Sequence, residues 1–151
     1  MKSLALTVYL SGEIHTDWRD QIETGLSDAG LPVVFLAPVT DHASSDDCGV
    51  EILGSEDEAF WKDHKGAKVN AIRTRAMIER SDVVVVRFGD KYRQWNAAFD
   101  AGFAHALGKP VITLHDNELT HPLKEVDAAA LAVAQSPSQV VKLLSYVING
   151  T

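Results

Sequence analysis

The chain has 151 residues, of which 14 are Lys or Arg and 21 are Asp or Glu, giving a formal net charge of −7 with histidine neutral. Hydrophobic residues make up 46% and charged residues 23%, a composition typical of folded proteins rather than disordered ones. Because no basic excess is available to neutralise phosphates, we expect no nucleic-acid partner. The length fits one domain over residues 1–151 around one core.

The cysteine, histidine and hydropathy patterns exclude further classes. A single cysteine, Cys48, excludes an intrachain disulfide and a multi-cysteine zinc site. The six histidines show no H-x-x-x-H or H-E-x-x-H spacing, so neither a metal nor another cofactor is predicted. No apolar stretch approaches the roughly 18 residues that span a membrane, and the amino-terminal run lacks a cleavage-site pattern. We therefore expect a cytoplasmic protein without a membrane partner.

Short apolar runs alternate along the chain with segments of helical periodicity. Such runs, rich in β-branched residues, are typical of strands buried on both faces of a parallel sheet. The helical segments carry apolar residues at a spacing near 3.6, as Trp18, Ile22 and Leu26 do in the first one. In chain order the expected elements are strand Leu4–Leu10, helix Thr16–Ala29, strand Val33–Ala37, helix Glu58–Arg80, strand Asp82–Phe88, helix Gln94–Leu107, strand Val111–Leu114, a weaker strand Leu131–Ala134 and helix Pro137–Val147.

This order predicts an α/β fold of three layers, in which helices cover both faces of a doubly wound, parallel, five-stranded sheet of flavodoxin-like or Rossmann-like type. We favour the strand order 2-1-3-4-5, because the chain begins with a strand and has five strand units. Ligands of such sheets bind at the carboxyl ends of the strands where the strand order reverses. That rule selects the loops after Leu10 and after Phe88 as the site.

The segment Pro38–Asp57 is the longest one without a predicted element, and it is polar and acidic. Loops of this length inside a compact domain are usually functional or disordered. We expect a flap over the site, with a disordered segment as the alternative.

The loop after the first strand combines a glycine with ionisable side chains. Gly12 lets the backbone approach a ligand, and the following helix offers free N–H groups to an anion. Glu13 and His15 have the chemistry of an acid or a base. The alternative is a plain strand-to-helix turn in which Thr16 or Asp17 caps the helix and Glu13 is solvated.

The helix expected after the third strand carries a carboxylate among small residues. Asn96 and Asp100 are four residues apart and share a helical face. The alanines and glycine around Asp100 leave room for a ligand. A separate stripe of Phe99, Phe103 and Leu107 is suited to packing on the sheet. The alternative for Asp100 is a carboxylate that only favours the helix dipole.

Aromatic and cationic side chains flank this helix. Tyr92 and Trp95 lie near its start, where their side chains can stack on the planar ring of a ligand. The alternative is that they are ordinary aromatic residues of the core or the rim. Arg73 and Arg75, late in the preceding helix, bind a phosphate or carboxylate if that helix delivers one of them to the pocket. The alternative for both arginines is a solvated basic helix end.

Three segments resemble the nucleoside 2-deoxyribosyltransferase superfamily, namely Val8–Gly12, Ser81–Val85 and Asp100–Pro110. The whole chain is more closely similar to the YtoQ family of small bacterial proteins, through Gly12–Arg19, Gln94–Asn96 and His121–Glu125. The resemblance covers essentially all 151 residues. It implies the flavodoxin-like fold and a small-molecule partner, a nucleoside or nucleotide.

In this superfamily a carboxylate on the helix after the third strand attacks the anomeric carbon of a deoxyribonucleoside and displaces the base. The resemblance puts this nucleophile at Asp100 and the tyrosine of the first strand at Tyr9. Asp100 is one methylene shorter than the usual glutamate. Two further acids of the superfamily pattern are replaced here by Thr74 and Gln94. Glu13 stands where a proline is common and is available to supply the missing acid.

We therefore predict an enzyme that breaks or transfers an N-glycosidic bond, by deoxyribosyl transfer or by hydrolysis. The alternative is a non-catalytic module of the same fold that binds or senses a nucleotide or sugar phosphate. The superfamily also implies a homo-oligomer, with His121–Glu125 as the contact or else as a cover for its own pocket. The predicted catalytic residues are Asp100, Glu13 and His15, and the predicted substrate-binding residues are Tyr9, Ser11, Gly12, Trp18, Arg19, Arg73, Gln94, Trp95 and Asn96.

Overall fold

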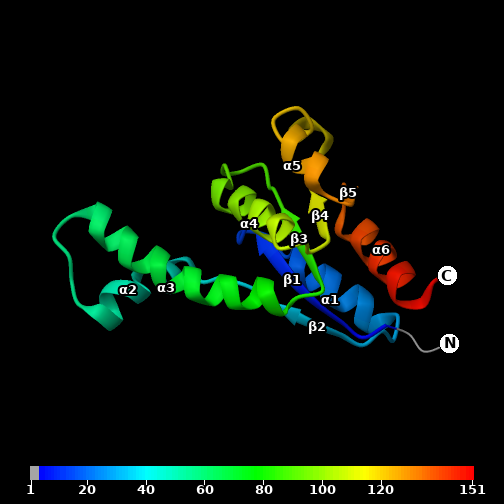
Figure 1. The fold of residues 1–151 in the computed structure, drawn as a ribbon, viewed down its shortest axis with the longest axis horizontal. Coiled ribbons are helices and arrows are strands. Elements are labelled where there is room, and N and C mark those ends of the chain that lie inside the picture. The colour runs from blue at the N-terminus through cyan, green and yellow to red at the C-terminus, as the bar shows by residue number, and fades with distance from the viewer. Residues whose placement is uncertain (1–3) are drawn as a thin grey trace.

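The computed structural model of the chain describes residues 4–151. Its strands form a parallel sheet in the order β2-β1-β3-β4-β5 (Figure 1). This is the predicted order, and each strand boundary lies within two residues of its predicted place. The strands are β1 (Leu6–Gly12), β2 (Val33–Leu36), β3 (Val83–Arg87), β4 (Val111–Leu114) and β5 (Ala132–Ala134).

Helices cover both faces of the sheet, as the alternation of strands and helices predicts. On one face, α1 (Trp18–Asp28) and α6 (Pro137–Asn149) bury their apolar side chains against the strands. On the other face lie α3 (Ala59–Arg80), α4 (Trp95–Ala106) and the short α5 (Lys124–Ala129), which follows a 3₁₀ turn, η1 (Asn117–Leu119). The sheet thus divides the core into two layers.

Alternation along β1 directs neighbouring side chains to opposite faces of the sheet. Val8 and Leu10 lie in the layer of α1 and α6, whereas Tyr9 is buried in the layer of α3 and α4. Ser11 is fully buried near the carboxyl end of the strand, in register with Val86 of β3. Tyr9 and Ser11 therefore both reach the side of the sheet that α3 and α4 cover.

The segment Pro38–Asp57 is not an irregular loop, and that prediction is wrong, because it contains α2 (His42–Leu53). Asp41 caps this helix, since its carboxylate accepts a hydrogen bond of 2.9 Å from the backbone N–H of Ser44. The helix has no apolar stripe to bury, and Gly49 is its one buried residue. Its sequence therefore lacks the helical periodicity from which the other long helices were predicted.

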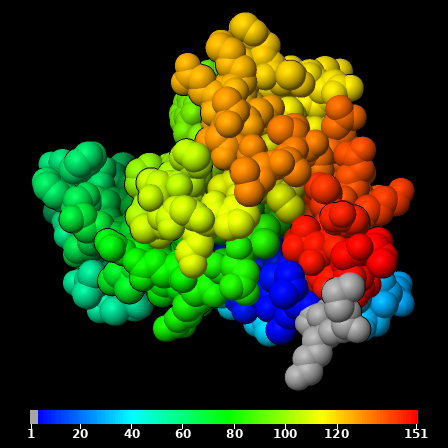
Figure 2. Space-filling view, turned by 45° about the vertical axis from the view of Figure 1, so that its right-hand side comes forward, coloured from blue at the N-terminus to red at the C-terminus, as the bar shows by residue number. Residues whose placement is uncertain are grey.

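α2 and the amino-terminal half of α3 form an arm, residues 42–70, that extends beyond the sheet (Figures 1 and 2). The 22 residues of α3 are about 33 Å long at 1.5 Å per residue, more than the roughly 23 Å of the seven-residue strand β1. α2 packs on the part of α3 that has no sheet beneath it. The two backbones meet closely, since a Cβ atom added to Gly49 would lie 2.4 Å from the backbone nitrogen of Gly66.

α4 packs on the sheet through its small residues rather than its large ones. Ala97, Ala101 and Ala104 are buried, whereas Phe99 is 74% and Leu107 is 42% exposed. The prediction that the stripe of Phe99 and Leu107 packs on the sheet is therefore wrong. Alanines let the helix approach the strands closely, and the phenylalanine is left on the side that faces away from the core.

Candidate functional site

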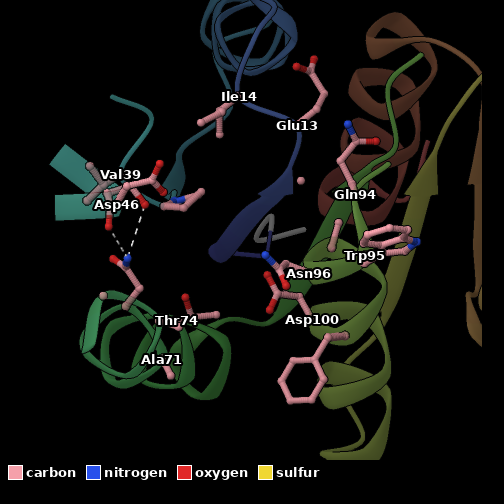
Figure 3. A pocket seen from close by; sticks show the side chains of 18 of the residues that line it. Glu13, Ile14, Val39, Asp46, Ala71, Thr74, Gln94, Trp95, Asn96 and Asp100 are labelled. Atoms are coloured by element: carbon pink, nitrogen blue, oxygen red, sulfur yellow. Dashed lines mark hydrogen bonds between the residues drawn. The ribbon is translucent and has the colours of Figure 1, made fainter. Parts of the chain in front are cut away.

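A cavity of about 1220 Å³ opens between the arm, α4, the carboxyl end of β1 and the loop that follows β3. Figure 3 shows this cavity from close by, with Asp100 and Asn96 on α4 across from Thr74 and Ala71 on α3. The strand order reverses between β1 and β3, which is where ligands of doubly wound sheets bind. The cavity exceeds the range of roughly 300–1,000 Å³ that is common for small-molecule sites.

Asp100 is a partly buried carboxylate on the wall that α4 gives to this cavity. The hydroxyl of Ser11, at the end of β1, donates a hydrogen bond of 2.8 Å to its Oδ2. Burial raises the pKa of Asp100 above its ordinary value, and the hydrogen bond from Ser11 opposes part of that rise. The carboxylate is thereby held in a fixed position with an oxygen available to a ligand.

Tyr9 lies beside this carboxylate and also lines the cavity. Burial and then the negative charge of Asp100 raise the pKa of Tyr9 to about 12, although hydrogen bonding with Thr74 and Ser11 works in the opposite direction. The phenol therefore keeps its proton at neutral pH and acts as a hydrogen-bond donor. We call Tyr9, Ser11, Thr74 and Asp100 the carboxylate cluster.

Gly12 shapes the turn that ends β1 and lines the cavity. Its φ is +118°, and a Cβ atom at this position would lie 2.1 Å from the backbone oxygen of Arg87 in β3. Only glycine fits this contact between neighbouring strands. Gly12 therefore sets the direction in which the chain enters the loop over the site.

Glu13 is neither solvated nor directed at the carboxylate cluster. It is 5% exposed, and its oxygens accept hydrogen bonds from the backbone N–H groups of His15 (2.6 Å) and Thr16 (3.1 Å) and from the Thr16 hydroxyl. Burial alone would raise the pKa of Glu13, but these hydrogen bonds and the charge of Arg87, 3.9 Å away, hold it below its ordinary value. In Figure 3 its carboxylate points away from Asp100.

Trp18 and Arg19, both predicted to bind substrate, are buried beneath the turn after β1 and are not among the residues that line the cavity. The indole N–H of Trp18 donates to the backbone oxygen of Glu13 at 2.9 Å. The guanidinium of Arg19 donates to the backbone oxygens of Glu13 (2.7 Å), Leu10 (3.0 Å) and Gly12 (3.2 Å). Their hydrogen bonds are thus used to hold the backbone of the turn, which corrects their predicted role.

Of the two arginines late in α3, the one predicted to bind substrate is not at the cavity. Arg73 lies outside the lining and donates to the backbone oxygen of Ala37 at 3.1 Å. Arg75 does line the cavity, with its guanidinium 5.9 Å from the ring of Phe103 and its Nε donating to Glu79 at 2.9 Å. Positions two residues apart on a helix face different directions, which the sequence could not resolve without the orientation of α3.

Gln94, Trp95 and Asn96 begin α4 at the mouth of the cavity, and all three line it. The side-chain oxygen of Gln94 accepts a hydrogen bond of 3.0 Å from the backbone N–H of Gly89. Its amide nitrogen is therefore the group that remains for a ligand. Trp95 is 74% exposed, with the guanidinium of Arg93 5.9 Å from its ring. Asn96 lies close to Asp100 in Figure 3, as their spacing predicts.

The arm contributes polar side chains that were not predicted as site residues. His42 and Asp46 of α2 line the cavity, and His42 Nδ1 lies 2.8 Å from Asp46 Oδ2. His15, which was predicted, stacks near them at 6.4 Å from the His42 ring and 4.7 Å from the Tyr92 ring. The local signal for α2 is Asp41, a residue type that is favoured at the N-cap of helices.

Three further observations bear on the expectations from the sequence. Among residues 4–151, no group of three or more His, Cys, Asp or Glu side chains is placed to hold a metal ion. In the same part of the chain, the helices are all too short or too polar to cross a bilayer. The segment His121–Glu125 does not line the cavity, so it does not cover its own pocket.

The fold is similar to those of two solved structures. A conserved protein from Enterococcus faecalis V583 matches with a TM-score of 0.61 and 13% identity, over 94% of this chain and 98% of the other. A 2-deoxyribosyltransferase from the psychrotolerant bacterium Bacillus psychrosaccharolyticus matches with a TM-score of 0.53 and 17% identity, over 89% of this chain and 90% of the other. At such low identities these similarities establish the fold alone.

Similarity in sequence is more specific. The chain is 41% identical over 142 residues to the uncharacterized protein YtoQ of Bacillus subtilis (strain 168), which covers 94% of this chain and 96% of that protein. Residues 9–148 match the family model described as nucleoside 2-deoxyribosyltransferase YtoQ. Because both matches extend over nearly the whole chain, the chain belongs to the YtoQ family of nucleoside 2-deoxyribosyltransferase-like proteins.

Proposed function

We propose that the protein is an enzyme that cleaves or transfers the N-glycosidic bond of a nucleoside or nucleotide, with Asp100 as the nucleophile. The observation that carries this proposal is the Asp100 carboxylate, which lines the cavity and is held at 2.8 Å by the Ser11 hydroxyl. A family described by nucleoside 2-deoxyribosyl transfer supports the same class of reaction.

In the first step an oxygen of Asp100 bonds to the anomeric carbon, C1′, while the bond from C1′ to the base breaks. The base leaves with the electron pair, and a glycosyl ester of Asp100 remains. In the second step water or another base displaces Asp100 from C1′, giving hydrolysis or transfer. Two displacements at one carbon retain its configuration, as in retaining glycosidases.

The neighbours of Asp100 fit this chemistry. The hydrogen bond from Ser11 keeps the carboxylate in one position, which favours the alignment that an attack on C1′ requires. The neutral phenol of Tyr9 is a donor for the sugar or for the carboxylate. The amides of Gln94 and Asn96 are suited to hydroxyl groups of the sugar, and Trp95 offers a flat surface to the base.

The remaining expectations stay predictions. His15 is proposed as a contact of the substrate at the rim, where it lies with Tyr92. Glu13 is proposed to act through the turn it holds rather than as an acid. Homo-oligomerisation, a cytoplasmic location and the absence of a nucleic-acid partner are likewise predictions from the sequence.

A second candidate function is a module that binds a nucleotide or sugar phosphate without converting it. The observation that favours it is the absence of an acid at Thr74 and Gln94, two positions that line the cavity. Such a module would be stabilised against heat by its ligand and would leave the ligand intact.

The test is to incubate the protein with deoxyribonucleosides and their 5′-monophosphates, with and without an acceptor base, and to separate free and exchanged bases by chromatography. We expect base release or exchange that Asp100→Asn lowers by at least about a thousandfold. Asp90→Asn is the matched control, because Asp90 is exposed and lies outside the cavity lining. Equal turnover by Asp100→Asn would refute the assignment, and thermal stabilisation without turnover would favour the binding module.

A further inference from the structure

The proposed reaction needs a proton donor that the carboxylate cluster does not contain. A departing base carries the electron pair of the broken bond and leaves faster when an acid protonates it. Thr74 and Gln94 are not acids, and Tyr9, with its pKa raised to about 12, is too weak an acid at neutral pH. Glu13 is held as a carboxylate in its own turn and points away from Asp100.

His42 and Asp46 form a histidine–carboxylate pair on the wall that the arm gives to the cavity. The two side chains are one helical turn apart on α2, and Nδ1 of His42 lies 2.8 Å from Oδ2 of Asp46. Because an ionised carboxylate only accepts hydrogen bonds, Nδ1 carries the proton and Nε2 is the nitrogen left for a ligand. Within residues 4–151, Nε2 makes no hydrogen bond. A carboxylate that orients an imidazole in this manner is typical of acid–base catalysis.

α3 relates this pair to the carboxylate cluster. The side-chain amide of Asn70 donates to the backbone oxygen of Ser45 in α2 at 2.9 Å, next to Asp46. Thr74 lies one turn further along the same face of α3, where it meets Tyr9. Four residues of helix rise about 6 Å, so α2 and the carboxylate cluster contact α3 at positions one helical turn apart. Figure 3 shows Asp46 and Asp100 on opposite sides of the same cavity.

We propose that His42, oriented by Asp46, gives the proton on its Nε2 to the departing base. This inference rests on the proposed function. In the first step, Asp100 bonds to C1′ as the bond from C1′ to the base breaks, and the base takes the electron pair together with the proton of His42. In the second step, the incoming water or base loses a proton to Nε2 as it displaces Asp100 from C1′. His42 is then protonated again, and the cycle balances.

Other titratable groups lie in the surroundings of this pair. Asp41, which caps α2, interacts with the charge of His42, and His15 stacks near the His42 ring from the turn after β1. Asp63 of α3 lines the same cavity. His15 is the less suitable donor, because no carboxylate orients its ring.

The experiment compares two substrates that differ in their need for protonation. One is a natural deoxyribonucleoside that the wild-type protein cleaves, and the other is the 2-deoxyriboside of 4-nitrophenol, whose leaving group departs without a proton. We expect His42→Gln to lower kcat for the nucleoside by on the order of a hundredfold and to change kcat for the nitrophenyl substrate little. His64→Gln is the matched control, because His64 stacks on Phe60 of the arm and does not line the cavity.

A second variant tests the pairing. Asp46→Asn is expected to lower kcat for the nucleoside and to change kcat for the nitrophenyl substrate little, because the imidazole loses the carboxylate that orients its ring. An equal loss on both substrates in His42→Gln, or no loss on either, would overturn the inference while Asp100→Asn still supports the nucleophile. If the wild-type protein cleaves neither substrate, the proposed function fails and the inference fails with it.

Discussion

Glu13 and Asp100 are two carboxylates that line the same cavity, and their surroundings shift their pKa values in opposite directions. Burial raises the pKa of Asp100, which has one hydrogen bond from a side chain. Burial would also raise the pKa of Glu13, but backbone and hydroxyl donors outweigh it. Carboxylates that differ in this way have different roles. Glu13 holds the turn after β1, whereas Asp100 remains available to a ligand.

Replacing Glu13 by glutamine is expected to destabilise the fold by about 1–3 kcal/mol at neutral pH, because buried donors and the Arg87 charge lose an ionised acceptor. The pKa of Glu13 is lowered by folding, so its contribution to stability is present above its ordinary value of 4.5 and is lost as the pH falls through the folded-state pKa. Urea unfolding of both proteins from neutral pH to about pH 4 measures this. A difference in stability that does not shrink towards acid pH would contradict the role.

Single residues of the site were predictable to the extent that their role depends on local sequence. That Asp100 and Asn96 line the same cavity follows from their spacing, because a helix brings residues four apart to one face. Gly12 was found because a glycine at the end of a strand indicates a tight turn. Trp18 and Arg19 were predicted to lie in the cavity, but their side chains lie beneath the turn after β1. A side chain near a binding loop can point into the cavity or beneath the loop, and only the three-dimensional path of the backbone distinguishes these two directions.

At the level of elements, the strands and the long helices on the sheet follow from hydrophobic periodicity, whereas α2 and the six-residue α5 do not. α2 buries one glycine and packs on α3 instead of the sheet, so its sequence has little pattern to detect. The part of the cavity wall that α2 supplies, which includes His42 and Asp46, was expected only as a flap over the site and not as a helix that places site residues. A helix held by a cap and a close backbone contact is visible only when its partner helix is known.

The contact between α2 and α3 depends on Gly49. A methyl group there would lie 2.4 Å from the backbone of Gly66, so Gly49→Ala must displace α2, and we expect a loss of about 1–3 kcal/mol of stability. Gly102→Ala is the matched control on α4, because a Cβ atom at Gly102 meets nothing within 4 Å. That change is expected to stabilise the fold by up to about 1 kcal/mol through helix propensity. Thermal unfolding of the two variants checks both signs.

The Gly49→Ala variant also tests whether the arm places His42 and Asp46 for the reaction. Displacement of α2 moves His42 and Asp46 relative to the carboxylate cluster, so turnover of a nucleoside should fall more than turnover of the nitrophenyl substrate. A variant that unfolds at a lower temperature but keeps the wild-type ratio of the two rates would indicate that the arm only stabilises α3.

For the molecule as a whole, the site and the stability of the fold are in conflict. The strand order reverses between β1 and β3, and the cavity opens at the carboxyl-terminal side of the sheet at that point. Asp100 lies there among buried alanines of α4. A carboxylate whose pKa is raised by burial is less stable as an ion in the folded state than in water. Selection for stability alone would not retain it.

Asp100→Asn should therefore unfold at a higher temperature than the wild-type protein at neutral pH, although it is expected to be inactive. The folded-state pKa of Asp100 lies above its ordinary value of 3.8, so the carboxyl group favours the fold most below that value, and this contribution is lost as the pH rises through the folded-state pKa. The difference in unfolding temperature between Asp100→Asn and the wild type should accordingly appear as the pH rises above about 4 and then become constant. Thermal unfolding of both proteins across this range measures it. A variant that is less stable than the wild type at neutral pH would mean that the hydrogen bond from Ser11 outweighs the effect of burial, and that the carboxylate is a structural group rather than a reactive one.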